Sequence, residues 1–248
     1  MTHLPVTYAG RLDPLAEGVL ILLIGDECLK KDEYLKLPKE YEVEILFGFE
    51  TDTYDVMGKV NTPSEDQAKS KIVFETVRPS FQKNLARRSE DLSNTTFDEA
   101  LKITIPKFTG RIKQFYPPYS SRTVNGKPLY LWAREGKLDE IEIPSHDVLV
   151  EKIEIIKESV IKGDELLNKI TKDIAEVRGD FRQKEILNIW QNVLENKKDE
   201  EYKTITLRIV CGSGVYVRSI AHEIGLALNQ PALALRIVRT KVGEYKIN

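Results

Sequence analysis

The sequence has few residues that could hold a metal ion or form disulfides. Its 248 residues include two cysteines and three histidines. Cys28 and Cys211 fit no paired metal-ligand spacing, and the histidines are far apart, so we expect no metal site. Two cysteines are also too few for the disulfide framework of a small secreted domain. We interpret both as buried, unreactive thiols, because free cysteine is among the most buried residue types.

Long hydrophobic runs and a strong net charge are also missing. The longest apolar run, Val19–Ile24, is far too short to cross a bilayer, and the first residues do not form a signal peptide. We therefore expect a soluble, cytoplasmic protein. The formal net charge is only −2, which by itself does not indicate a nucleic-acid partner. The local distribution of charge therefore decides that question.

The sequence has enough apolar residues for one large domain. Hydrophobic residues make up 41% of the chain, too many for a disordered protein, and charged residues make up 31%. Strand and helix patterns mix without a regular βαβ rhythm. This favours an α+β fold with a central mixed, mostly antiparallel sheet flanked by helices. We expect a single domain over residues 1–248 with a helical insertion at 159–201.

Periodicity and turn signals place the main elements. Asn125-Gly126 is a hairpin turn signal, and the polar segment Gln67–Asn94 is compatible with helical stretches. Alternating or continuous apolar patterns predict strands, and apolar residues at helical spacing predict helices. The expected strands are Val19–Ile24, buried on both faces, and Tyr41–Phe49, Val148–Ile156 and Thr204–Cys211, with another in Ala234–Ile247. The expected helices are Phe97–Ile105, a pair within Ser159–Glu201, and Val217–Leu228.

Gly10–Pro14 (GRLDP) carries the strongest chemical signal. Asp13 lies between a glycine and a proline, in a loop just before an apolar strand. Such a loop can present a carboxylate at the edge of a rigid scaffold. The alternative is a turn aspartate that only caps neighbouring backbone amides. From these residues alone, both interpretations stay open.

A basic segment with interleaved aromatic residues lies in the middle of the chain. From Lys107 to Lys137 there are seven lysines and arginines, and Glu135 is the only acidic residue. Tyr116, Tyr119, Tyr130 and Trp132 are spread among them. Such a hairpin suits phosphate contact and base stacking, and the alternative is a solvated surface.

Several blocks of the sequence resemble the TruB family of pseudouridine synthases. Residues 10–30 (GRLDPLAEGVLILLIGDECLK) resemble its catalytic segment, Gly-x-Leu-Asp-Pro-x-Ala-x-Gly followed by an apolar strand. The Gly-Arg-Leu-Asp core alone is also similar to the RsuA and RluA synthases. Three further blocks, 39–58, 114–136 and 211–225, resemble TruB segments, as does the tail 235–243. The blocks occur in family order.

The resemblance implies a cofactor-free enzyme that isomerises uridine to pseudouridine, with uridine 55 in the T-arm of tRNA as its target. Asp13 matches the catalytic aspartate, and Tyr41 matches the tyrosine that packs against the target base. Arg218 matches the arginine that pairs with the carboxylate, and Leu235 matches an apolar residue lining the pocket. Asp13 could attack the ribose, attack the base or abstract a sugar proton. The target base must be flipped out of the folded RNA.

Residues 107–148 match the family's arm, a thumb-like hairpin that closes over the RNA stem-loop. The expected RNA contacts lie at the catalytic segment, in this arm and in the tail. They are Tyr8, Arg11, Arg122, Lys127, Tyr130, Arg134, Arg236 and Arg239. We expect the 159–201 insertion to pack on the outer face. No membrane contact and a monomeric state are expected.

The sequence departs from the family pattern at both ends. Only Met1–Tyr8 precede Ala9, so a strand with Lys-Pro-x-Gly-x-Thr-Ser has no counterpart, and no PUA domain follows Asn248. RNA contacts are then expected from the catalytic domain alone. Tyr8 replaces the usual histidine and is expected to stack in its place. Two alternatives stay open: a catalytically inactive RNA-binding or RNA-chaperone protein, and a synthase acting on another RNA.

Overall fold

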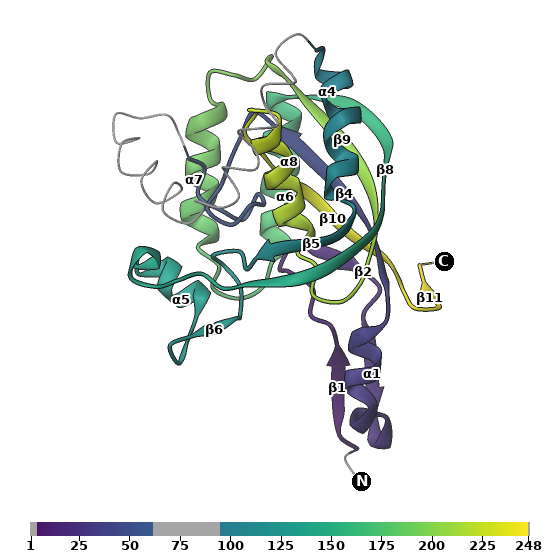
Figure 1. Ribbon diagram of the computed structural model, residues 1–248. Helices are drawn as coiled ribbons and strands as arrows, with labels where there is room; N and C mark the ends of the chain where they lie inside the picture. The colour runs from purple at the N-terminus through teal and green to yellow at the C-terminus, as the bar shows by residue number, and fades with distance from the viewer. Residues whose placement is uncertain (1–3, 62–94, 248) are drawn as a thin grey trace.

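A computed structural model describes residues 4–61 and 95–247, so Gln67–Asn94, where helical stretches were considered, lies outside the described residues. A seven-stranded sheet forms the centre, in the order β11-β10-β4-β9-β8-β5 (Figure 1). These neighbours pair antiparallel, while β2 runs parallel to β10. The predicted mixed, mostly antiparallel sheet is confirmed. Its strands are β2 (Ala16–Gly18), β4 (Lys39–Phe47), β5 (Gly110–Phe115), β8 (Ser145–Lys162), β9 (Glu201–Cys211), β10 (Ala232–Val242) and β11 (Tyr245–Lys246).

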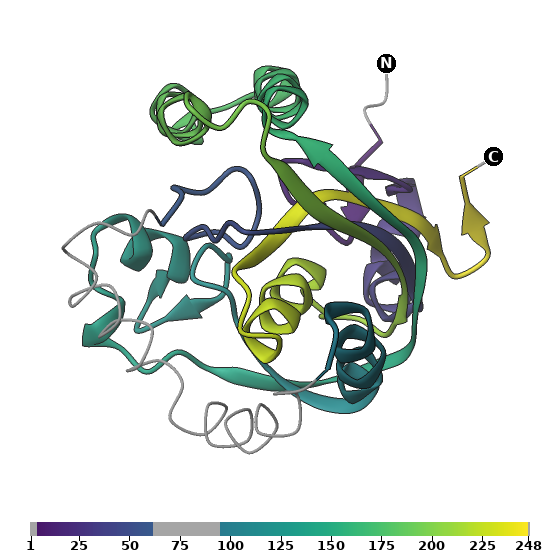
Figure 2. The same cartoon turned by 90° about the horizontal axis from the view of Figure 1, so that it is seen from above.

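Two helices fill the concave face of the curved sheet (Figure 2). They are α8 (Val217–Ala227) and α4 (Phe97–Thr104), which is followed by the 3-10 helix η3 (Ile105–Phe108). Thr96 caps α4 through a reciprocal capping box with Glu99. Alternate residues of β4, such as Val43 and Ile45, are fully buried against these helices. This apolar layer fixes the orientation of α8, which carries Arg218.

The insertion forms two helices, as predicted, and covers one end of the second face of the sheet (Figure 2). They are α6 (Gly163–Glu176) and α7 (Gln183–Leu194). Their inward side chains are fully buried and pack against Leu233 and Leu235 of β10 and against Phe49 and Val56. The insertion therefore packs against a loop beside the site as well as the sheet. No helix in the described part of the chain is long and apolar enough to span a membrane.

The predicted strand at Val19–Ile24 differs from expectation. It shortens to β3 (Ile21–Ile24), which pairs only with β1 (Val6–Ala9) in a two-stranded sheet that projects from the body (Figure 1). η1 (Gly25–Lys30) and α1 (Lys31–Lys36) follow it. Leu22 and Ile24 are 60% and 56% exposed, because only one face of this hairpin is packed. A continuous apolar run cannot by itself distinguish a strand covered on two faces from one covered on a single face.

The two cysteines have different surroundings. Cys211 is buried in the main core, and burial raises the pKa of its thiol to about 12, as expected of an unreactive cysteine. Cys28 is only partly buried, so the expectation of two buried thiols is wrong for Cys28. Its Sγ lies within hydrogen-bond distance of the Leu23 and Pro5 carbonyls.

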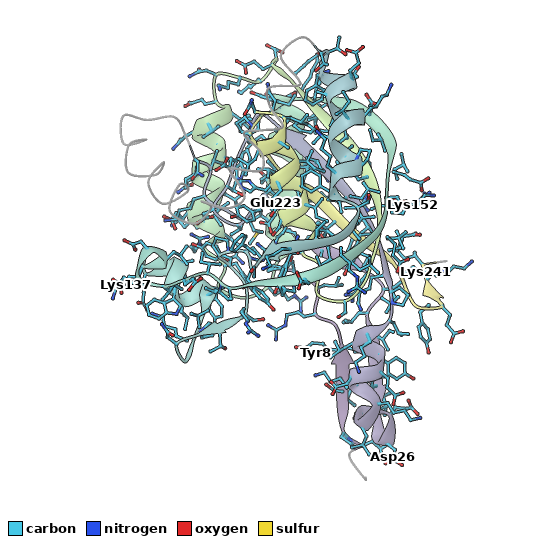
Figure 3. All side chains as sticks on the ribbon, in the orientation of Figure 1. Tyr8, Asp26, Lys137, Lys152, Glu223 and Lys241 are labelled. Carbon is cyan, nitrogen blue, oxygen red and sulfur yellow. The ribbon has the colours of Figure 1, made fainter. Side chains whose placement is uncertain are left out.

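The arm is shorter than the predicted range 107–148. Its first part, β5, pairs with β8 as the edge strand of the central sheet. The remainder holds the hairpin β6 (Thr123–Val124) and β7 (Lys127–Pro128), then α5 (Leu129–Arg134) and η4 (Leu138–Glu140). Asn125 and Gly126 both have positive φ, as the predicted hairpin turn requires. Lys137 lies at its outer end (Figure 3).

The charge of the arm is balanced once its true limits are known. Residues 116–144 contain four cations and four anions, because three anions follow Lys137. Over 107–144 the remaining positive charge comes from Lys107, Arg111 and Lys113, in β5 and just before it. The cations of the arm are Arg122, Lys127, Arg134 and Lys137, and its anions are Glu135, Asp139, Glu140 and Glu142.

Candidate active site

Backbone hydrogen bonds and one buried arginine fix the loop that carries Asp13. Arg239 of β10 donates from Nε to the Val19 carbonyl at 2.7 Å and from Nη2 to the Gly10 carbonyl at 3.0 Å. Gly18 lies against the backbone of the same residue, where a Cβ would fall 2.3 Å from the Arg239 carbonyl oxygen. The parallel pairing of β2 with β10 therefore needs glycine at this position.

Asp13 forms an ion pair with Arg218. Arg218 lies in the first turn of α8, and its Nε donates to Asp13 Oδ2 at 2.9 Å. Its other nitrogens donate to the carbonyls of Thr53 and Tyr119, the latter at 2.8 Å. The Arg218 side chain is 3% exposed, whereas the Asp13 side chain is 34% exposed. The pair thus presents an oriented carboxylate to the surface with a buried cation behind it.

Asp55 is a second carboxylate at this site, and the sequence analysis missed it. It is buried, and its Oδ1 accepts from Thr53 Oγ1 at 2.7 Å and from the Met57 amide at 2.9 Å. Burial raises the pKa of Asp55 to about 6, although Arg218 and these hydrogen bonds oppose the rise. Burial opposes a charged Arg218 too, but Asp13 and Asp55 hold the pKa of Arg218 above its ordinary value. Arg218 therefore interacts electrostatically with two carboxylates, Asp13 and Asp55.

Replacing Asp55 with asparagine should change how stability depends on pH. The folded-state pKa of Asp55, about 6, exceeds its ordinary value of 3.8, so its neutral form favours folding and this contribution is lost as pH rises from 4 to 6. Relative to wild type, Asp55→Asn should gain roughly 2 kcal/mol in free energy of unfolding between pH 4 and pH 7. Urea denaturation at each pH measures this difference. Parallel pH profiles for the two proteins would contradict the assignment.

Tyr41 is buried on the concave face of the sheet, within electrostatic range of Asp13. Burial raises the pKa of its hydroxyl, and the charge of Asp13 raises it further, while Arg239 opposes the shift. The hydroxyl is therefore protonated at neutral pH and can donate a proton. Leu235 is buried in the core shared with the insertion, where Leu15 packs against the same cluster. The structure thus pairs Arg218 with Asp13 and places Tyr41 within electrostatic range of Asp13. Leu235 lies in the cluster against which Leu15 packs.

Tyr8, Arg11 and Tyr130 form a second group, at the junction between the projecting hairpin and the body. Arg11 Nη2 donates to the Tyr8 hydroxyl at 2.9 Å, and Tyr8 is partly exposed (Figure 3). Tyr130 of α5 is also partly exposed and lies close enough to Arg11 to affect the pKa of its guanidinium. An accessible pair of tyrosines with an arginine between them suits base stacking.

The predicted cations of the arm are already engaged. Lys127 lies 2.5 Å from Glu135 and over the Trp132 ring, and Arg134 donates to the carbonyl of Asp180 in the α6–α7 loop. The Arg122 guanidinium lies over the Tyr116 ring, 5.2 Å from its centroid. These contacts lie at the surface, with the Lys127 side chain 25% exposed, and are therefore weak enough to exchange for phosphate.

The structure corrects the role predicted for Arg239 and qualifies that of Arg236. Arg239 is 1% exposed and holds the loop that carries Asp13, so it cannot contact RNA. Arg239 lies opposite Tyr41 in the β10–β4 pairing, so its side chain points into the core. Arg236 is exposed and forms an ion pair with Glu17. Among the described residues, no group of three or more histidine, cysteine, aspartate or glutamate side chains could hold a metal ion.

Comparison with known proteins fits the geometry of this site. Residues 3–98 and 87–166 match the family described as TruB family pseudouridylate synthase (N terminal domain), which covers more than half of the chain. The chain belongs to the TruB family. The resemblance found in the sequence blocks is thereby confirmed.

Members of the TruB family in bacteria align with almost the whole chain. A tRNA pseudouridine synthase B from Bacteroides thetaiotaomicron is 26% identical over 244 residues, which cover 98% of this chain and 74% of that protein. The protein of that name from Lactobacillus delbrueckii subsp. bulgaricus is 27% identical over 242 residues, covering 98% of this chain and 60% of that protein. The chain is thus shorter than these TruB relatives.

Solved structures resemble the chain more distantly. A chain in the crystal structure of a Cbf5-Nop10-Gar1 complex has a TM-score of 0.49 and 16% identity, covering 98% of this chain and 42% of that chain. A chain in an H/ACA RNP bound to a substrate RNA containing 2'-deoxyuridine has a TM-score of 0.45 and 15% identity, covering 98% of this chain and 40% of that chain.

Proposed function

We propose that this chain isomerises uridine to pseudouridine in RNA through Asp13, without a cofactor, and that its target is uridine 55 in the T-arm of tRNA. The observation that carries the proposal is the Asp13–Arg218 pair, in which a partly exposed carboxylate is oriented by a buried arginine. Membership of the TruB family and the name of its tRNA-modifying relatives support the substrate class. The cytoplasmic location and the monomeric state stay predictions.

The reaction rearranges the substrate without adding or removing atoms overall. The N1–C1′ bond of the uridine breaks and a C5–C1′ bond forms; the C5 hydrogen leaves as a proton, and N1 gains one. An ionised Asp13 can serve as nucleophile or base in this exchange, with Arg218 holding its orientation. The protonated hydroxyl of Tyr41 is the neighbouring group able to donate or relay a proton.

A tritium-release assay tests the proposed activity. Unmodified tRNA transcript with uridine tritiated at C5 should release tritium to water when incubated with the wild-type protein, and nearest-neighbour mapping should place the product at position 55. Release from another position or another RNA would retain the reaction and overturn the target. Tight tRNA binding without release would favour the binding-protein alternative, and neither binding nor release would mean an inactive chain.

Neutralising three cations of the arm should weaken RNA binding and its dependence on salt. In the triple variant Arg122→Ala, Lys127→Ala and Arg134→Ala, each lost phosphate contact removes counterion release. The slope of log K against log salt should therefore fall by roughly 0.7 to 0.9 per contact. Filter binding at several KCl concentrations measures the slope. Lys152→Ala is the control, because Lys152 is an exposed lysine on the far side of the molecule from Lys137 (Figure 3). An unchanged slope in the triple variant would show that the arm does not contact RNA.

A further inference from the structure

The insertion reaches the active site through one arginine. Arg182 immediately precedes α7 and has a left-handed backbone, with φ 64°. Its guanidinium donates to both carboxylate oxygens of Asp52, from Nη1 at 3.0 Å and from Nη2 at 3.4 Å. It also lies over the Tyr119 ring, 4.6 Å from the centroid. Because this side chain is only 16% exposed, the contacts are much less screened than a surface ion pair.

The two segments that Arg182 joins are the two that hold Arg218. Asp52 precedes Thr53, whose carbonyl accepts from Arg218, and the carbonyl of Tyr119 accepts from Arg218 at 2.8 Å. Arg182 therefore binds the side chains of the same loops whose backbones orient Arg218. Burial and the nearby Asp52 carboxylate raise the pKa of the Tyr119 hydroxyl, so the ring under Arg182 stays neutral.

The insertion presents Arg182 from a fixed position. Trp190 Nε1 donates to the Val56 carbonyl at 3.0 Å, and Glu185 pairs with Lys59 at 2.7 Å, so α7 is attached to the loop 51–60 at two further points. The side-chain amide of Gln183 donates to the carbonyls of Val177 and Gly179, and these hydrogen bonds close the turn before α7. Arg182 thus approaches Asp52 from a rigid support.

We propose that Arg182 is a positioning residue for the isomerisation, holding the Thr53 and Tyr119 carbonyls in the places that orient Arg218 toward Asp13. This inference rests on the proposed function. It gives the insertion a part in catalysis, because loosening either loop would let Arg218 shift relative to Asp13. Lysine cannot replace the arginine, since its single ammonium group cannot bind both carboxylate oxygens in a fork and also lie flat on the ring.

The test compares Arg182→Ala, Arg182→Lys and Arg178→Ala with wild type in single-turnover pseudouridine formation and in tRNA binding. Small displacements of a catalytic group cost up to about a hundredfold in rate, so Arg182→Ala should react roughly ten to a hundred times more slowly at saturating enzyme. Arg182→Lys should recover little of that loss, and RNA affinity should change only a few-fold in either variant. Arg178 is an exposed arginine of the same turn, and its alanine variant should react like wild type.

Hydrogen exchange of the 51–60 amides gives a readout independent of activity. Exchange in this loop should be faster in Arg182→Ala, while the strands of the central sheet stay protected. Unchanged exchange, or a wild-type rate in Arg182→Ala, would overturn the inference. Weaker RNA binding with an unchanged saturated rate would also overturn it, by making Arg182 a phosphate contact. A wild-type protein without turnover would instead overturn the proposed function, and exchange alone would then decide whether Arg182 holds the loop.

Discussion

Asp13→Asn should abolish pseudouridine formation and leave tRNA affinity within a few-fold of wild type. Asparagine has nearly the same shape but cannot act as a carboxylate nucleophile or base, and loss of such a group costs at least about a thousandfold in rate. The substitution should leave the loop in place, because Gly10 and Val19 are bound by Arg239 rather than by Asp13. Single-turnover tritium release and filter binding measure the two quantities.

Asp26→Asn is the matched control for this prediction. Asp26 is an exposed aspartate at the end of the projecting hairpin, well away from Glu223 of α8 (Figure 3). The Asp26→Asn variant loses the same single negative charge, but far from the site, so its rate of pseudouridine formation should equal that of wild type. If Asp13→Asn turned over at the wild-type rate, the proposed role of the carboxylate would be wrong.

Some residues of the site could be predicted from short sequence motifs, and others could not. Asp13, Tyr41 and Arg218 could be predicted because each lies in a short motif, and the structure brings them together. Asp55 was missed although it lies in the block 39–58 that resembles a TruB segment, because aspartate in such a loop is also a common turn residue. Only its burial beside Arg218 separates the two interpretations, and burial depends on how the loop meets α8.

Arg239 and Arg182 show why side-chain roles need the packed structure. Arg239 was grouped with surface cations because the tail is basic, but its position opposite Tyr41 turns it inward. Arg182 lies in a segment whose charges nearly balance, and its partners Asp52 and Tyr119 are far away in sequence. The elements themselves followed from periodicity, including α6, α7 and α8. The error at β3 arose because the apolar run does not reveal which faces are covered.

Arg218→Met should both stop turnover and destabilise the fold. Methionine fills much of the same volume but leaves Asp55 buried without its cation. Removing Arg218 leaves the Thr53 and Tyr119 carbonyls without their donor, so the free energy of unfolding at pH 7 should fall by about 3–5 kcal/mol. The charge of Asp55 accounts for about 1.4 kcal/mol of this at most, because a carboxyl with a pKa of about 6 takes up a proton instead. The loss should shrink at pH 5, because Asp55 takes up a proton and no longer needs a positive partner. Urea denaturation at both pH values measures the change.

The double variant Arg218→Met and Asp55→Asn separates the electrostatic effect from lost packing. Asparagine keeps an oxygen for the Thr53 and Met57 donors but carries no charge, so the second substitution should restore about 1 kcal/mol of the stability that Arg218→Met removes at pH 7. Turnover should stay abolished, since Asp13 still lacks its partner. If instead the effects of the two single substitutions on the free energy of unfolding simply add, Asp55 and Arg218 are not coupled. The buried cation would then serve Asp13 alone, and the second carboxylate would have no part in the site.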